Sequence, residues 1–120
     1  MLNSYKELKV WQKSIELVLE IYNLTKLFSK EETYGLTSQM RRSAVSIPSN
    51  IAEGYSRKHR QEYSQFIRVA FSSAAELETQ MIIAGKLELV SEKDFNKVET
   101  LLDEVLRMLH GLNKSLLAKP

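Results

Sequence analysis

Basic side chains concentrate in one stretch of the sequence, where they could bind phosphate. Residues 41–60 contain five arginines and lysines against a single acid, Glu53. The residues that would contact phosphates in and beyond this stretch are Arg41, Arg42, Arg57, Lys58, His59, Arg60 and Arg68. The rings of Tyr55 or Tyr63 would stack on unpaired bases. These residue types favour nucleic-acid binding, and the plain alternative is a basic connector that only faces solvent.

Residue patterns typical of catalysis are missing from the sequence. Without cysteine, thiolate metal sites, disulfides and a cysteine nucleophile are excluded. Neither His59 nor His110 belongs to the Glu-x-x-His pair that holds metals in four-helix bundles. Glu76 and Glu78 are two residues apart, so on a helix they point to different sides. No glycine-rich phosphate loop is present. We therefore expect no enzymatic activity, no cofactor and no metal.

The composition describes a small protein of mild positive charge. Its 120 residues suggest a single domain over residues 1–120. The formal net charge is +2 and the pI is about 8.8. Residues 1–60 carry ten lysines and arginines against six acids, whereas residues 61–120 carry seven against nine. This asymmetry indicates an anionic partner for the first half of the chain.

No segment of the sequence suggests export or membrane insertion. No apolar run approaches the roughly 18 to 20 residues that a membrane-spanning helix needs. The opening "MLNSYKELKVWQKS" is charged and lacks the apolar core of a signal peptide. The absence of cysteine is compatible with a reducing compartment. We expect a cytoplasmic protein that makes no membrane contact.

Apolar residues recur at steps of three and four along nearly the whole chain, which is the spacing of amphipathic helices. We predict helices over residues 5–28, 32–54, 60–88 and 92–117. Ser4 with Glu7, and Ser91 with Asp94, have the spacing of capping boxes at two of the helix starts. No β-strand alternation competes with this pattern. The sequence therefore predicts an all-α fold, a single antiparallel up-down-up-down four-helix bundle.

The first predicted helix carries more apolar surface than one core needs. One stripe consists of Leu8, Trp11, Ile15, Val18 and Tyr22. A second stripe beside it consists of Val10, Leu17, Ile21, Leu24 and Phe28. A helix that is apolar around much of its circumference usually buries more than one side. Since the bundle core takes one stripe, we expect the remaining apolar surface to lie at an interface between subunits.

Pro48 places a residue without an N–H inside the second predicted helix. An internal proline removes one hydrogen bond and crowds the carbonyl four residues earlier, here Ala44, at a cost of about 3 kcal/mol. The helix either kinks near Pro48 and continues, or breaks there and restarts at the proline. Met40, Ala44, Ile47 and Ile51 keep helical phase across this point. We therefore predict a kinked helix rather than a broken one.

A polar strip runs along the same helix. It comprises Gln39, Arg42, Ser46, either Ser49 or Asn50, and Glu53. Its serines and asparagine can hydrogen-bond the backbone that the proline disturbs. We predict that some of Arg42, Asn50, Glu53 and Glu76 meet in a partly buried network, because an isolated buried charge is costly. The alternative is that all four face water. Gly54 then reads as the residue that ends the helix.

Three stretches of the sequence resemble one bacterial protein family. "SQMRRSAVSIPSNIAEGYSR" at residues 38–57 is similar to the signature of the 23S rRNA intervening-sequence proteins, also grouped under an S23 ribosomal protein label. "FIRVAFSSAAELETQM" at residues 66–81 also matches, although Ser72 and Ser73 stand where members typically have a Gly-Ser pair. The opening "YKELKVWQKSIELV" is similar as well. The resemblance thus covers nearly the whole chain.

The resemblance implies a non-enzymatic four-helix bundle. Family members are encoded in intervening sequences of large-subunit rRNA genes, or elsewhere in bacterial genomes. A related accessory protein of diversity-generating retroelements forms a pentameric barrel with a basic surface that binds nucleic acid and a reverse transcriptase. We therefore expect a homo-oligomer, a pentamer by resemblance, that binds structured RNA such as rRNA. The alternative is a scaffold or adaptor whose ring docks a protein partner.

Overall fold

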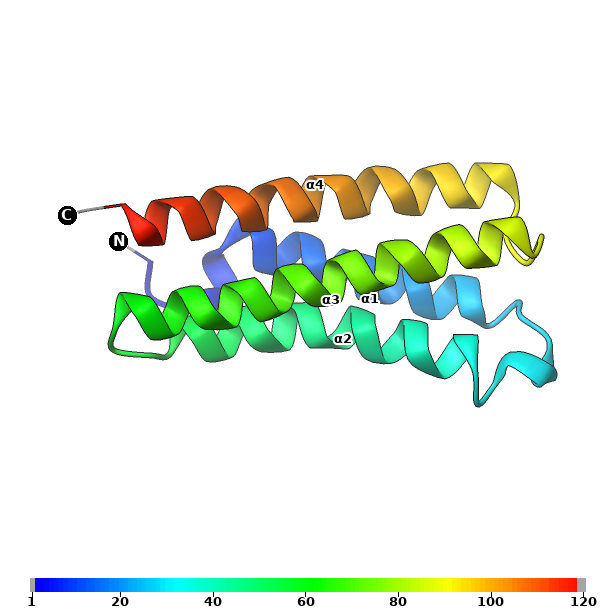
Figure 1. Ribbon diagram of the computed structural model, residues 1–120, viewed down its shortest axis with the longest axis horizontal. Helices are drawn as coiled ribbons and strands as arrows, with labels where there is room; N and C mark the ends of the chain where they lie inside the picture. The colour runs from blue at the N-terminus through cyan, green and yellow to red at the C-terminus, as the bar shows by residue number, and fades with distance from the viewer. Residues whose placement is uncertain (1, 119–120) are drawn as a thin grey trace.

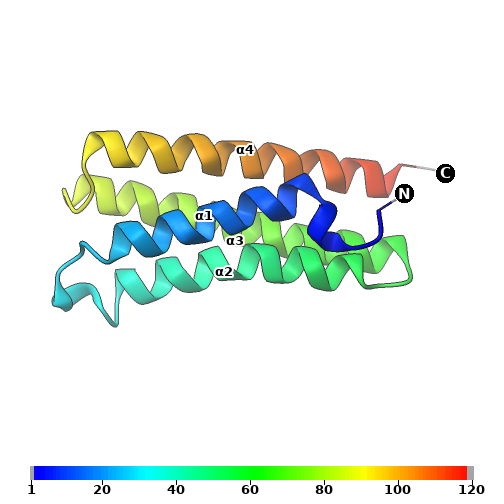
Figure 2. The same ribbon diagram turned by 180° about the vertical axis from the view of Figure 1, so that it is seen from behind.

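Four long helices make up almost the whole molecule, whose computed structural model describes residues 2–118 (Figure 1). The elements in chain order are the 3-10 turn η1 (Tyr5–Glu7), α1 (Lys9–Thr25), the 3-10 turn η2 (Lys30–Glu32), α2 (Leu36–Tyr55), α3 (Arg60–Lys86) and α4 (Glu92–Leu117). No strand occurs in this range. Each helix runs antiparallel to the next, and α1 packs on both α2 and α4 (Figures 1 and 2). The predicted four-helix bundle is confirmed.

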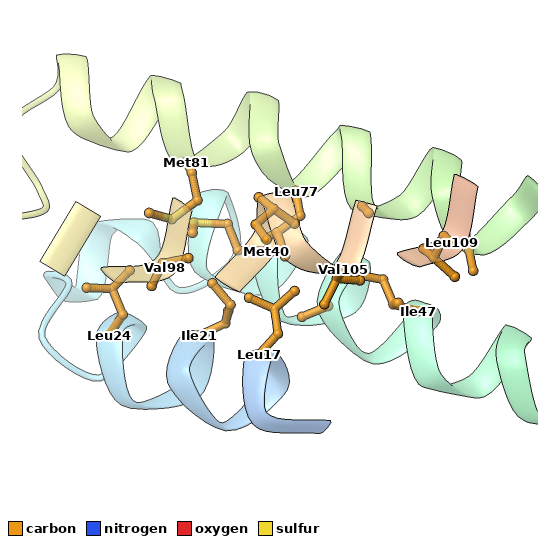
Figure 3. Close-up of a cluster of buried hydrophobic side chains, with 14 of the residues drawn as sticks. Leu17, Ile21, Leu24, Met40, Ile47, Leu77, Met81, Val98, Val105 and Leu109 are labelled. Carbon is orange, nitrogen blue, oxygen red and sulfur yellow. The ribbon is translucent and has the colours of Figure 1, made fainter. Parts of the chain in front are cut away.

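The core lies along the axis of the bundle and draws apolar side chains from all four helices (Figure 3). Its largest fully buried members include Leu17, Ile21, Met40, Ile47, Leu77, Met81, Leu102, Val105 and Leu109. Between α2 and α3 the core is made partly of alanines, among them Ala44, Ala70 and Ala74, which are fully buried. Small side chains let two helices approach closely. This close approach accounts for the small side chains of α3 that lie against α2.

The first predicted helix begins too early. Ser4 does act as a cap, but its hydroxyl accepts from the Lys6 amide at 3.1 Å and opens only the short turn η1. Leu8 is then extended, with φ −71° and ψ 126°, so α1 starts at Lys9 rather than at residue 5. Tyr5 meets the ring of Trp11 edge to face, with 5.5 Å between centroids, and this contact holds η1 against α1.

The remaining helix bounds differ from the predictions mainly in the connectors. The α1 helix ends at Thr25 instead of residue 28, and α2 begins at Leu36 instead of residue 32, because the turn η2 occupies part of the segment between them. The α4 helix spans the predicted range, and the Ser91 hydroxyl caps it by accepting from the Asp94 amide at 3.1 Å.

The α3 helix stops two residues before the predicted position because the chain reverses there. Glu88 takes a left-handed conformation with φ 61°. The Leu89 amide then donates to Ala84 O at 2.9 Å, and the Glu88 amide donates to Gly85 O at 3.0 Å. This is the bonding pattern of a Schellman cap, in which glycine is the favoured residue at the left-handed position.

The α2 helix runs without interruption through Pro48. The helix therefore does not break and restart at the proline, whereas the kink itself stays a prediction, and Met40, Ala44, Ile47 and Ile51 all lie in the core. Polar side chains bond to carbonyl groups beside the proline: Ser49 Oγ donates to Val45 O at 2.9 Å, and Asn50 Nδ2 donates to Ser46 O at 2.8 Å. These side chains add hydrogen bonds to the turn around the proline, although neither replaces the missing bond to Ala44 O.

Only one of the two apolar stripes of α1 enters the core. Four residues of the second stripe are buried in the core, namely Val10, Leu17, Ile21 and Leu24. The first stripe is only half-buried: Leu8, Trp11 and Val18 pack against the edge of the core, and Tyr22 at its end is exposed. Leu19, which belongs to neither stripe, is 59% exposed. The α1 helix thus keeps apolar surface that its own bundle does not cover.

Candidate nucleic-acid interface

One end of the bundle gathers basic residues from three separate parts of the chain. The connector between α2 and α3, the N-terminal segment and the end of α4 lie together there (Figures 1 and 2). Tyr55 Oη donates to Leu2 O at 3.1 Å, and Arg60 Nη2 donates to Ser115 O at 3.1 Å. We name this the basic end and define it by Lys6, Lys9, Arg57, Lys58, His59, Arg60 and Lys114, all of them exposed. The opposite end, with the connectors 26–35 and 87–91, is named the mixed end.

The connector of the basic end is short and tightly held. Only residues 56–59 separate α2 from α3. Gly54 lies against α3, where a Cβ in its place would be 2.8 Å from Phe66 Cβ and 3.0 Å from Tyr63 Cδ1. The sequence predicted that Gly54 ends the helix. This is wrong, because α2 continues to Tyr55. The role of Gly54 is to let the two helices meet closely just before the connector.

Two basic side chains, Arg57 in the connector and Arg60 at the start of α3, are held in place by neighbouring groups. The Arg57 guanidinium lies 4.7 Å from the centre of the Phe66 ring and 3.6 Å from Glu53 Oε2. Arg60 is bound to the end of α4 through its contact with Ser115. Lys58 and His59, between them, are exposed. The arrangement presents two oriented guanidinium groups and two unbraced side chains to an anion, which suits contacts to successive phosphates.

Three of the seven predicted phosphate contacts lie away from the connector. Arg41 is sixteen residues before Arg57 on α2, which corresponds to about 24 Å along a helix. Its Nε donates to Thr25 Oγ1 at 2.8 Å, and its guanidinium lies 4.5 Å from the centre of the Tyr22 ring. Arg41 therefore joins α2 to α1. Arg42 lies on the same part of α2, and Arg68 lies on α3. The segment 41–60 does not form one patch in space.

The two tyrosines proposed to stack on bases are engaged within the fold. The rings of Tyr55 and Tyr63 meet edge to face with 5.9 Å between centroids. Burial raises the pKa of the Tyr63 phenol above 10.0, and the neighbouring Tyr55 raises it further. Tyr63 therefore stays neutral in the folded protein at any ordinary pH. Both rings are half-buried beside the connector and pack against each other, and their stacking on a base stays a prediction.

The predicted polar network forms only in part and with different partners. Ser46 Oγ and Ser73 Oγ are 2.8 Å apart across the α2–α3 interface, and Asn50 Nδ2 donates to the same Ser46 hydroxyl at 3.0 Å. A turn away, Ser43 Oγ donates to Glu76 Oε1 at 2.9 Å. Asn50 and Glu76 thus take part through serines. Arg42 and Glu53 lie outside this network, and the four predicted residues do not meet one another.

Sequence reasoning missed basic residues that only the fold brings to this end. Lys6 and Lys114 are separated by more than a hundred residues, and neither belongs to a basic run. It also missed a groove between α3 and α4 lined by Arg68, Phe71 and His110. One signal could have pointed to the groove: Phe71 is an aromatic residue outside the apolar stripe of its helix, three residues after an arginine.

The chemistry available at the basic end is anion binding. Within residues 2–118 no three histidine, aspartate or glutamate side chains come close enough together to hold a metal ion. Over the same range, no helix combines the length and the apolar character that crossing a membrane requires. What the basic end offers is a set of exposed basic side chains, of which Arg57 and Arg60 are held in place by neighbouring groups.

Comparison with known proteins identifies the family. The chain matches the family model described as 23S rRNA-intervening sequence protein over residues 6–111. A search of curated proteins gives no match. The chain has the same fold as a protein of unknown function from Bacteroides thetaiotaomicron VPI-5482, whose crystal structure is assigned to the S23 ribosomal protein family. The TM-score is 0.82 and the sequence identity is 24%. That similarity covers 88% of this chain and 98% of the other. This chain belongs to the family of 23S rRNA-intervening sequence proteins.

Proposed function

We propose that this protein binds nucleic acid, structured RNA such as rRNA first, through the basic end of the bundle and without catalysing a reaction. The observation that carries the proposal is the convergence of lysines and arginines from three chain segments on one end, around a connector held by Gly54. Exposed charges contribute little to stability. Their accumulation at one end is therefore better explained by an anionic partner than by the needs of the fold.

The proposal includes a homo-oligomer, which is supported by apolar side chains that the bundle leaves exposed. Leu19 and Tyr22 on α1 and Val45 on α2 are among them, and exposed apolar surface of this kind often marks an interface between subunits. A closed ring would repeat the basic end once per subunit, so weak contacts would act together. The family resemblance favours five subunits, and the lack of cysteine fits a cytoplasmic location.

Two matched triple variants test the binding proposal. The first replaces Lys6, Lys58 and Lys114 by glutamine at the basic end, and the second replaces Lys26, Lys30 and Lys86 at the mixed end. All six lysines are exposed, so both variants lose the same charge with little effect on folding. Binding to a structured rRNA fragment is measured by fluorescence anisotropy at several salt concentrations.

We expect the basic-end variant to bind at least about tenfold more weakly and to lose about 2 from the slope of log K against log salt, since each phosphate contact contributes about 0.7 to 0.9. The mixed-end variant should bind nearly as the parent does. Equal losses in the two variants would show that only net charge matters and would contradict a site at the basic end.

A protein scaffold is the second candidate, and the exposed apolar surface favours it. If the parent protein is an oligomer in sedimentation experiments but binds neither rRNA fragments nor DNA at low salt, the ring would serve to dock a protein. If sedimentation instead shows a monomer at micromolar concentration, this result would contradict both the ring scaffold and the repetition of the basic end.

A further inference from the structure

A groove with its own chemistry lies between α3 and α4, about two turns from the connector. Its volume is about 300 Å³, which falls at the lower limit of the usual range for small-molecule sites. Ile67 and Leu109 form an apolar floor and are fully buried. The described side chains that line the groove include no carboxylate. An anion that enters it therefore meets no opposing charge from the lining.

Three side chains of the groove suit two parts of a nucleotide, its base and its phosphate. Phe71 leaves 38% of its surface exposed, although it lines a groove, so part of its ring is open to a planar ligand. Arg68 lies three residues earlier on the same side of α3, and His110 faces them from α4. A guanidinium binds phosphate with paired N–H groups, and an aromatic ring stacks on a base whatever its sequence.

A hydrogen-bond donor completes the groove. Ser64 Oγ donates to Asn113 Oδ1 at 2.5 Å, and this bond orients the amide. The Asn113 N–H groups are what this side chain can still offer to a ligand. Base edges and ribose hydroxyls both accept such bonds. The groove therefore combines an aromatic ring, two basic side chains and an oriented amide donor above an apolar floor.

We propose that the α3–α4 groove binds one unstacked nucleotide of a single-stranded stretch of RNA, with the base on Phe71 and its phosphate on Arg68 and His110. This inference rests on the proposed RNA binding at the basic end and extends it. The two sites are continuous, because Lys114 lies one helical turn after His110 and Arg60 contacts the neighbouring Ser115. Phosphates of one strand can thus pass from the connector along α4 into the groove.

The two histidines of the chain provide a direct test. His59 lies in the connector and His110 in the groove, so the carbon-bound protons of their imidazole rings report on the two places separately in one NMR spectrum. The parent protein is titrated at low salt with a short unpaired RNA and with an RNA duplex of equal charge. We expect the unpaired RNA to shift the signals of both histidines and the duplex to shift mainly those of His59.

Each outcome of this titration decides something. If unpaired RNA shifts the signals of His59 alone, the groove proposal is overturned while the proposed function stands. If neither RNA shifts any histidine signal, the proposed function fails and the groove fails with it. A shift of His110 by inorganic phosphate as large as that caused by RNA would reduce the site to an anion site without base recognition, and would also contradict the proposal.

Affinities of variants test the stacking role. Phe71→Leu keeps apolar bulk but removes the aromatic face, and Val69→Ala truncates another exposed residue of α3 outside the groove. We expect Phe71→Leu to weaken binding of unpaired RNA by about fivefold or more, with duplex binding changed less than twofold. Val69→Ala should change neither. Equal binding of unpaired RNA by Phe71→Leu and the parent would overturn the assignment, provided that both proteins melt cooperatively at similar temperatures.

Discussion

The two ends of the bundle are formed by the same four helices but differ in charge. The basic end has six lysines and arginines, Lys6, Lys9, Arg57, Lys58, Arg60 and Lys114, against three acids, Glu7, Glu53 and Glu62. The mixed end has four lysines, Lys26, Lys30, Lys86 and Lys93, against five acids, Glu31, Glu32, Glu88, Glu92 and Asp94. A bundle with a net charge of only +2 thus concentrates its positive charge on one end.

The ends also differ in how firmly their connectors are held. At the basic end four residues link α2 to α3, with Gly54 packed against α3 just before them. At the mixed end ten residues link α1 to α2, and within them Leu27 is 75% exposed and Tyr34 is 96% exposed. Rigid placement of binding groups lowers the entropy lost on binding. Positive charge and a tightly held connector therefore coincide at the basic end.

The largest expected effect comes from loosening the basic end at Gly54. In Gly54→Ala the new Cβ would lie 2.8 Å from Phe66 Cβ, so α2 and α3 must separate or rotate. We expect the free energy of unfolding in urea to fall by about 1 to 3 kcal/mol, which is typical of overpacking. The connector should lose its fixed geometry, and RNA affinity should fall with it.

Gly111 provides the matched control for this substitution. It lies in α4, and a Cβ added there would have no neighbouring atom within 4 Å. Gly111→Ala should therefore stabilise the protein by about 0.5 to 1 kcal/mol, because alanine is the better helix former. If both alanine variants change stability in the same direction, close packing at Gly54 is not what holds the basic end.

A smaller effect is expected at the mixed end, where the chain is strained. Glu88 occupies the left-handed position of the cap after α3, where a side chain is disfavoured. We expect Glu88→Gly to raise the free energy of unfolding by up to about 1 kcal/mol, part of the relief being offset by the greater freedom of glycine in the unfolded chain. Thermal and urea unfolding would measure it.

Glu88→Ala separates backbone strain from charge. It removes the same carboxylate but keeps a Cβ in the left-handed conformation, so the strain remains. No comparable gain should result. If alanine stabilises the protein as much as glycine does, the local excess of acids at the mixed end, not the backbone, is the source of the effect.

The smallest expected effect is a change in stability at alkaline pH. Because burial raises the pKa of Tyr63 above its unfolded value, the folded state keeps this proton after the unfolded state loses it. The contribution is fully present below pH 10 and is lost as pH rises through the folded pKa. Tyr63→Phe should therefore flatten the decline of unfolding free energy above pH 10. Tyr34→Phe, at the mixed end, controls for the loss of any one phenol and should retain the decline.

The helices could be predicted from the sequence because their apolar periodicity is long and regular. The prediction for α4 is correct to the residue, since Ser91 and Asp94 mark its start and a stripe of valines and leucines runs to its end. The predicted start of α1 is wrong because Ser4 caps only the single turn η1. The extended residue Leu8 then separates this turn from α1. A capping signal says that a turn begins but does not say how far the helix continues.

The candidate interface could be predicted only where it is local in sequence. The basic residues of the connector form a run, which the sequence shows directly. Lys6, Lys114 and the groove around Phe71 come from segments that meet only after folding, so no spacing rule connects them. Arg41 looks close to the connector in sequence, although it stands sixteen positions before Arg57 and is separated from it by several turns of α2. Tyrosine burial, likewise, depends on the approach of α2 to α3 at Gly54.

The contact between Tyr5 and Trp11 gives the basic end an optical property. The chain has one tryptophan, and it lies where η1 packs against α1. The emission of that indole depends on how well its half-buried ring is shielded from water. Lifting η1 from α1 would shift the emission to longer wavelength and change its intensity. The molecule therefore contains an intrinsic fluorophore that reports on the N-terminal side of the basic end without any label.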